Sequence, residues 1–114
     1  MPDPLSQTFS ALADPTRRAI LAELALGERT VSQLVEGRGM SQPAISKHLK
    51  VLQQAGLIER GREAQTRPCR IAPRGLDAAS GWIDRCRADW EDTFGRMDAF
   101  LAGMAAPRDK GGTP

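Results

Sequence analysis

The residues with the clearest chemistry form one short polar run, SQPAISKHLK, from Ser41 to Lys50. On a helix, Gln42, Ser46 and Lys47 would lie on or beside one face. A glutamine amide can pair with both N6 and N7 of adenine, a serine hydroxyl can donate or accept, and a lysine can reach guanine or a phosphate. The run therefore predicts a helix face that contacts DNA bases, although any surface helix shows polar residues opposite its core face.

Basic side chains gather around this run. The whole chain has 16 Lys and Arg against 14 Asp and Glu, for a formal charge of +2. Residues 41–75 hold seven basic and two acidic side chains, a net +5, whereas residues 76–114 hold five basic and seven acidic, a net −2. This asymmetry favours a surface that meets a polyanion, and a solvated basic loop is the alternative interpretation.

Catalytic and metal chemistry have little support in the sequence. His48 is the only histidine, no Ser-His-Asp or Cys-His arrangement is evident, and Cys69 and Cys86 lack the paired spacing of a metal knuckle. An isolated cysteine is usually a small buried hydrophobe, so a redox or unfamiliar metal role for either is the lesser alternative. We expect no enzyme, no metal site and no cofactor. His48 itself could pack or face a phosphate instead of contacting a base.

The N-terminal residues MPDPLSQTF lack the basic and apolar regions of a signal peptide. No stretch approaches the roughly 20 apolar residues of a membrane span. With only two cysteines in 114 residues, a reducing cytoplasm is the expected location.

Capping signals predict four short helices. Leu5, Phe9 and Leu12 recur at helical spacing, and Asp14-Pro15 then starts a second helix that runs to about Leu26. Thr30 caps a third helix, which a Gly-containing turn at residues 37–39 separates from a fourth helix that Ser41 caps and Gly56 ends. Two helices joined in this way form a helix-turn-helix candidate. Its expected core includes Ile20, Leu21, Leu24, Ile45, Leu49 and Leu52.

A hairpin is expected next. Residues 57–60 and 69–72 are strand-like and flank a polar segment that contains glycine and arginine. Such a hairpin would act as a wing, on which Arg62 and Arg67 contact phosphates and position the protein. Arg60 and Arg70 could equally be surface residues on the strand faces.

Beyond Pro73, apolar residues recur every three or four positions up to Met104. A domain this small cannot bury so long a stripe, so we expect a second copy of the chain and the first helix to cover it. Trp82 borders the stripe, where packing is favoured over an effector pocket. The expected domain covers residues 1–106, followed by a disordered tail, 107–114. The candidate dimer-interface residues are Leu5, Phe9, Ile83, Cys86, Trp90, Phe94, Met97 and Leu101.

Two runs give the chain a specific resemblance. FSALADPTRR followed by AILAEL, and SQPAISKHLKVLQQAGLIER, resemble the ArsR-type repressor family over almost everything between Leu5 and Met104. RPCRIAP leading into GWIDRCRADWEDTF is closer to the non-metal, autorepressor-like branch. The resemblance implies a winged-helix dimer on a palindromic operator, with DNA contacts at the positions of Gln42, Ser46, Lys47 and His48.

The departures from the family concern metal binding. Metal-sensing relatives carry a Cys-x-Cys pattern in the third helix, where residues 30–34 of this chain are TVSQL. Other relatives place Asp and His ligands along the final helix, yet His48 is the only histidine here. A histidine-based metal site within one subunit is therefore excluded, and the expected protein lacks the metal switch of its relatives.

The sequence thus predicts a mainly α protein with a small β-hairpin, a winged helix-turn-helix that dimerises through its terminal helices and regulates transcription, as a repressor. One alternative is a winged-helix module that docks on protein, which would not need a polar face beside seven basic residues. Another is a regulator that senses a small molecule or thiol oxidation. The candidate DNA contacts are Thr30, Ser41, Gln42, Pro43, Ser46, Lys47, His48, Lys50, Arg62 and Arg67.

Overall fold

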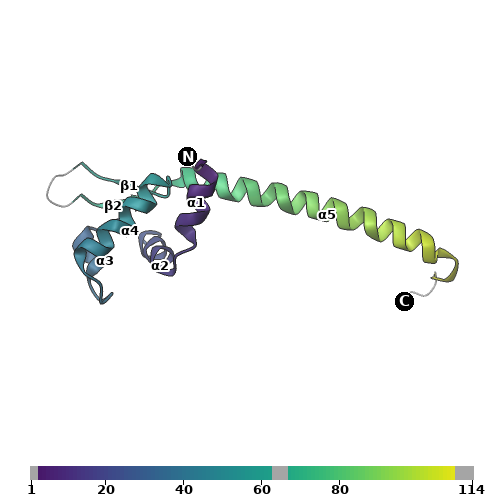
Figure 1. Cartoon of the computed structure of the whole chain (residues 1–114), viewed down its shortest axis with the longest axis horizontal. Coiled ribbons are helices and arrows are strands. Elements are labelled where there is room, and N and C mark those ends of the chain that lie inside the picture. The colour runs from purple at the N-terminus through teal and green to yellow at the C-terminus, as the bar shows by residue number, and fades with distance from the viewer. Residues whose placement is uncertain (1–2, 63–66, 110–114) are drawn as a thin grey trace. The chain divides into compact units, whose positions relative to one another are not determined.

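The computed structural model of the chain describes residues 3–62 and 67–109 (Figure 1). It divides into two compact units, Met1–Ser80 and Gly81–Pro114. The predicted class is confirmed, because the described elements are mostly helical with one two-stranded hairpin. In chain order they are α1 (Pro4–Leu12), α2 (Pro15–Leu24), α3 (Val31–Val35), α4 (Gln42–Gln54), β1 (Ile58–Arg60), β2 (Cys69–Ile71) and α5 (Pro73–Asp109).

The first four helices each begin at a polar cap. Asp14, Thr30 and Ser41 accept hydrogen bonds from the third backbone N–H that follows each of them, as the sequence predicts. Asp3 caps α1 in the same way, since its side chain accepts the Ser6 N–H at 2.9 Å. Helix α2 ends earlier than predicted, at Leu24. Gly27 lies beyond this end at a φ of +149°, and the intervening turn leaves Leu26 80% exposed.

The core of the first unit lies between α1–α4 and the hairpin. The predicted stripes of α2 and α4 are confirmed, since all their members are buried. Thr8 of α1 is the one buried polar residue identified among the described residues, and its hydroxyl lies 3.1 Å from the Ala55 carbonyl at the end of α4. The largest fully buried side chains are Ile20, Leu34, Ile45, Leu49, Leu52, Leu57, Ile58, Thr8 and Cys69.

The hairpin pairs antiparallel, with Ile58 opposite Ile71, Glu59 opposite Arg70, and Arg60 opposite Cys69. Each strand is one residue shorter than predicted. Ala72 N still donates across the hairpin to Leu57 O at 3.0 Å, but Leu57 N donates to Leu52 O at the end of α4 and does not return the bond. A backbone bridge between Arg29 and Cys69 ties the loop after α2 to β2, with N···O distances of 3.1 and 2.7 Å.

The first turn of α5 lies against the end of α4. Gly75 N donates to Gly56 O at 2.8 Å. A Cβ atom at residue 75 would lie 2.8 Å from Gly56 O and 2.9 Å from Ala55 O, so only glycine allows this approach. Together with Thr8, Gly75 satisfies carbonyl groups that the end of α4 would otherwise leave unpaired.

The second unit contributes the rest of α5. None of its described side chains, residues 81–104, is buried. The helix continues to Asp109, so residues 107–109 of the expected tail are helical, while 110–114 lie outside the described residues. Within the described part of the chain, no helix is long and apolar enough to cross a membrane.

Candidate nucleic-acid interface

Helix α4 separates an apolar side from a polar one. Its buried side consists of Ile45, Leu49 and Leu52. Most of the predicted contact residues on α4 lie away from this stripe: Gln42, Pro43, Lys47 and Lys50 are exposed, and Ser46 is half-buried. The polar face therefore carries a serine, an amide and two lysines that a groove of DNA could meet.

Two of the candidate contact residues also cap helices. The Ser41 hydroxyl accepts the Ala44 N–H at 3.2 Å, and the Thr30 hydroxyl accepts the Gln33 N–H at 3.2 Å. The Gln33 side chain completes a capping box by accepting the Thr30 N–H at 2.8 Å. Each hydroxyl keeps its own proton for donation, so capping and a phosphate contact are compatible.

An ion pair anchors the turn between α3 and α4. Arg38, flanked by Gly37 and Gly39 with φ values of +77° and +69°, donates to Glu23 of α2 at 2.7 Å. Glu23 also lies 3.4 Å from Arg29 Nε. The pair ties the turn before α4 to α2. The sequence analysis missed it because Arg38 and Glu23 are 15 residues apart, and only the fold brings them together.

His48 points toward the start of α2. Its Nδ1 lies 3.3 Å from Nη1 of Arg17 and 3.9 Å from Oδ2 of Asp14, and its side chain is 20% exposed. The Arg17 backbone N–H, and after it the charge of Arg17, hold the pKa of Asp14 below its usual value. Of the contact residues predicted on α4, His48 is the one with a side-chain partner from another helix.

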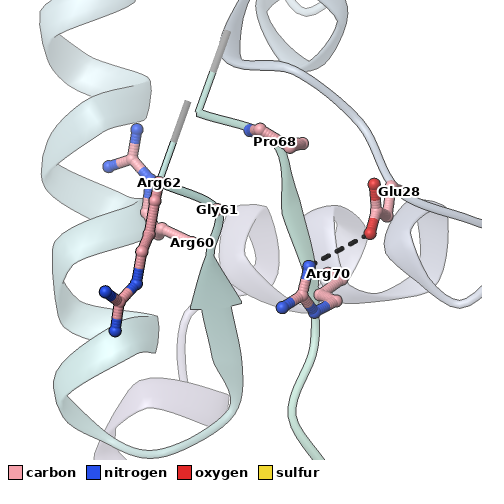
Figure 2. Close-up of a pocket in the computed structure, with 6 residues that line it drawn as sticks. All are labelled: Glu28, Arg60, Gly61, Arg62, Pro68 and Arg70. Atoms are coloured by element: carbon pink, nitrogen blue, oxygen red, sulfur yellow. Dashed lines mark hydrogen bonds and ion pairs between the residues drawn. The ribbon is translucent and has the colours of Figure 1, made fainter. Parts of the chain in front are cut away.

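The wing carries the second group of predicted contacts. Arg62 and Arg67 are both exposed, and Arg67 adopts a φ of +35°. Between the strands and the loop after α2 lies an open cavity of about 450 Å³. Figure 2 shows Arg70 paired with Glu28 on one side and Arg60 and Arg62 on the other. Because Glu28 also lines the cavity and pairs with Arg70, the lining groups that suit an oxyanion such as a phosphate are the guanidinium groups of Arg60 and Arg62.

Arg60 and Arg70, which the sequence left undecided, differ in their partners. Arg70 pairs with Glu28 at 3.2 Å and with Glu59 at 3.1 Å, and these carboxylates raise its pKa. The Nε of Arg60 is buried and has no hydrogen-bond partner in the described part of the chain. Arg70 is thus already neutralised by two carboxylates, whereas Arg60 retains an unsatisfied donor near the cavity.

The two cysteines have different surroundings. Cys69 is fully buried, and burial raises the pKa of its thiol, which disfavours the reactive thiolate. Cys86 is half-buried on α5. Among the side chains that the structure describes, no group of three or more His, Cys, Asp or Glu is placed to hold a metal ion.

The candidate dimer residues lie on α1 and α5. Leu5 and Phe9 are half-buried on α1, and Cys86 is half-buried on α5. The other five, all on α5, are between 41% and 61% exposed: Ile83, Trp90, Phe94, Met97 and Leu101. Phe100 and Met104, each 67% exposed, extend this apolar surface. The interface itself stays a prediction, because it requires a second chain.

Comparison with known proteins identifies the region that contains the helix-turn-helix candidate. Residues 14–60, which span α2 through β1, match the family model "Bacterial regulatory protein, arsR family". The arsenical resistance operon repressor of Escherichia coli is 38% identical over 100 residues, covering 87% of this chain and 83% of the relative. The probable mercury resistance operon repressor of Streptomyces lividans is 42% identical over 64 residues, 56% of this chain and only 51% of the relative. These relatives are named as repressors, not as enzymes.

Solved structures agree with the fold. A crystal structure of an ArsR family transcriptional regulator, RHA00566, superposes with a TM-score of 0.74 and 36% identity, covering 78% of this chain and 98% of that one. The homodimeric winged helix-turn-helix DNA-binding domain of Mb0332 from Mycobacterium bovis gives 0.61 and 30% identity, over 76% of this chain and 81% of the other. The predicted winged helix-turn-helix is confirmed: α3 and α4 are its two helices and the β1–β2 hairpin is its wing.

Proposed function

The chain belongs to the ArsR family of bacterial regulatory proteins, and from that premise we propose that it represses transcription as a homodimer bound to a palindromic operator. The observation that supports this most directly is the exposed polar face of α4 beside an arginine-lined wing. In this arrangement two copies of α4 enter successive major grooves, about 34 Å apart, and block access to the promoter.

We propose that the contact residues have two different roles. Gln42 and Ser46 lie toward the N-terminal end of α4, where recognition helices approach base edges most closely. Lys47 and Lys50 reach phosphates or guanine, and Arg62 contacts the backbone from the wing. The α4 face supplies sequence preference, and the wing supplies affinity for any sequence.

The homodimer is supported by the apolar face of α5. Trp90, Phe94 and Leu101 are each more than half exposed in a single chain. A neighbouring structure in the same family is described as homodimeric. A second copy would remove this apolar surface from water, with Leu5 and Phe9 of α1 completing the interface.

We further propose that DNA release does not use the metal sites of metal-sensing relatives. The third helix and its cap supply TVSQL in place of a Cys-x-Cys pattern, and His48 is the single histidine of the chain. Adding zinc, cadmium or arsenite to the protein–DNA complex should therefore leave the Kd unchanged. A metal that releases the operator at stoichiometric concentration would overturn this part of the proposal.

The experiment that tests the function is selection of bound sequences from a random DNA pool. We expect an imperfect palindrome whose half-site centres lie about one helical turn, roughly 10 base pairs, apart. Enrichment of no sequence, or of a single non-repeated site, would contradict a symmetric repressor.

Variants then separate the two contact groups. Gln42→Ala and Ser46→Ala should relax the selected consensus, whereas Arg62→Ala and Arg67→Ala should weaken binding to all sequences and reduce the salt slope by about one unit each. Gln53→Ala, an exposed glutamine at the other end of α4, is the matched control. Equal loss of specificity from both groups would contradict the division of labour.

A further inference from the structure

The side chain of Arg17, on α2, contacts both the end of α1 and His48 on α4. Its Nε donates to the Ala11 carbonyl at 2.7 Å and its Nη2 to the Ser10 carbonyl at 3.1 Å, so most of the guanidinium is fixed at the end of α1. The remaining Nη1 lies 3.3 Å from Nδ1 of His48 on α4. One side chain thus connects α1, α2 and the helix whose polar face we assign to DNA.

The contact with Arg17 determines which nitrogen of the His48 imidazole carries the proton. A guanidinium only donates hydrogen bonds, so Nδ1 must accept and carry its lone pair. The nearest carboxylate that could accept a proton from Nδ1 belongs to Asp14. It lies 3.9 Å away, outside hydrogen-bond range, and its Oδ2 already accepts the Arg17 backbone N–H at 3.0 Å. When the ring is neutral, its single proton therefore lies on Nε2.

The protonated nitrogen faces away from this contact. His48 Nε2 makes no hydrogen bond to the described residues, and the side chain is 20% exposed. The buried side-chain polar atoms that lack a partner in this part of the chain are Arg38 Nε and Arg60 Nε, so His48 Nε2 keeps contact with solvent. His48 Nε2 thus provides an N–H donor at the border of the polar face of α4, next in sequence to Lys47.

We propose that Arg17 is a positioning residue that holds His48 in the Nε2–H tautomer, and that His48 then donates, as a neutral ring, to a phosphate oxygen of bound DNA. The second half rests on the proposed function, while the first half concerns the free protein. A neutral donor displaces no counterion, so this contact adds affinity without adding to the salt dependence of binding, unlike a lysine or arginine.

The tautomer can be measured directly because the chain has one histidine. In protein labelled with ¹⁵N-histidine at about pH 8, above the ordinary titration range of histidine, we expect an unprotonated Nδ1 and a protonated Nε2. Arg17→Met should shift the ring toward a mixture of tautomers. Arg18→Met is the matched control, because Arg18 also donates to α1, at Leu12 O and 2.7 Å, but is not bonded to His48.

Arg17→Lys, which keeps the positive charge but replaces the planar guanidinium with a single ammonium group, is the second variant if Arg17→Met fails to fold as judged by circular dichroism. It should give an intermediate tautomer ratio. A wild-type spectrum with the proton on Nδ1, or an unchanged ratio in both Arg17 variants, would overturn the positioning role.

Amide substitutions at residue 48 test the DNA contact. The amide of His48→Asn lies near Nδ1 and leaves no donor at Nε2, whereas the longer His48→Gln places an N–H near Nε2. We expect His48→Asn to weaken operator binding about tenfold with an unchanged salt slope, and His48→Gln to stay within about threefold of wild type. An unaltered Kd in His48→Asn, or a slope reduced by about one, would overturn the neutral contact.

The outcomes also separate this proposal from the proposed function. A wild-type protein that binds no DNA but shows the Arg17-dependent tautomer would refute the repressor function and keep the positioning role. A protein that binds its operator with no response to His48→Asn would keep the function and remove His48 from the contact.

Discussion

Large apolar side chains are buried in the first unit but exposed in the extension from Gly81 onward. In the first unit Ile20, Leu34 and Leu49 have no exposed surface. In the extension Trp90 and Phe94 are 61% and 59% exposed, and no described side chain from 81 to 104 is buried. The first unit encloses its core with several elements, whereas a single helix cannot cover its own apolar stripe.

The apolar surface that needs a partner therefore lies on the extension. Ile83, Trp90, Met97 and Met104 are spaced seven residues apart, the period of a helix that packs along another helix. The first unit should fold on its own contacts, and the extension should become stable when a second copy covers it. Substitutions in the two regions should therefore differ in what they disturb.

Trp90→Glu should have the largest effect, since it places a charge in the middle of the apolar face of α5. We expect the dimer Kd to rise by roughly a hundredfold or more, with the first unit still folded. Light scattering measures the mass, and circular dichroism the folding. Ala88→Glu adds the same charge at an exposed position off the heptad stripe and should leave the dimer intact. A dimeric Trp90→Glu would remove the extension from the interface.

Leu49→Ala and Leu101→Ala make the same truncation in the two regions. Leu49 has no exposed surface, so its loss should lower the free energy of unfolding by about 2–5 kcal/mol. Leu101 is 53% exposed, so in the monomeric Trp90→Glu background its truncation should change that free energy little. Urea denaturation followed by circular dichroism checks both. Equal losses would show that the extension packs within its own chain.

Glycine substitutions should have opposite signs in the two regions. Gly75→Ala forces a Cβ against the carbonyl oxygens of Gly56 and Ala55 and should destabilise the first unit by about 1–3 kcal/mol. A Cβ at Gly95 meets nothing within 4 Å, so Gly95→Ala should stabilise α5 by about 0.5–1 kcal/mol. Thermal unfolding of both variants gives the comparison. A neutral Gly75→Ala would mean that the start of α5 is not held against α4.

Asp14→Asn should produce the smallest effect, visible only through its pH dependence. The folded pKa of Asp14 is lowered from its ordinary 3.8, mainly by the Arg17 N–H. Its ionised form therefore stabilises the fold above pH 3.8, and this contribution disappears as the pH falls through the lower folded value. Asparagine keeps the cap without titrating. The Tm of wild type should exceed that of Asp14→Asn at neutral pH, and the gap should close in acid.

Asp98→Asn on the exposed part of α5 is the control for Asp14→Asn, and it should leave the Tm of the first unit unchanged at every pH. A constant Tm gap between wild type and Asp14→Asn from pH 7 to pH 2 would contradict the titration argument.

Features that depend on residues close together along the chain could be predicted from the amino-acid order. The caps at Asp14, Thr30 and Ser41 involve backbone groups three residues away, and the buried stripe of α4 follows the helical period, so both could be predicted. The hairpin and the polar face of α4 followed from the same kind of pattern. The end of α2 was misplaced by about two residues because propensity does not fix where the chain turns before Gly27.

The pairing of charged side chains could not be predicted, because it depends on the folded backbone. Arg17 and His48 are 31 residues apart, Arg38 and Glu23 are 15 apart, and Arg70 and Glu28 are 42 apart. No local pattern selects such partners, because long side chains with many rotamers pair only after the backbone has been placed. The sequence thus determined that α4 presents a polar face, and the fold decided which of its residues is held by another helix.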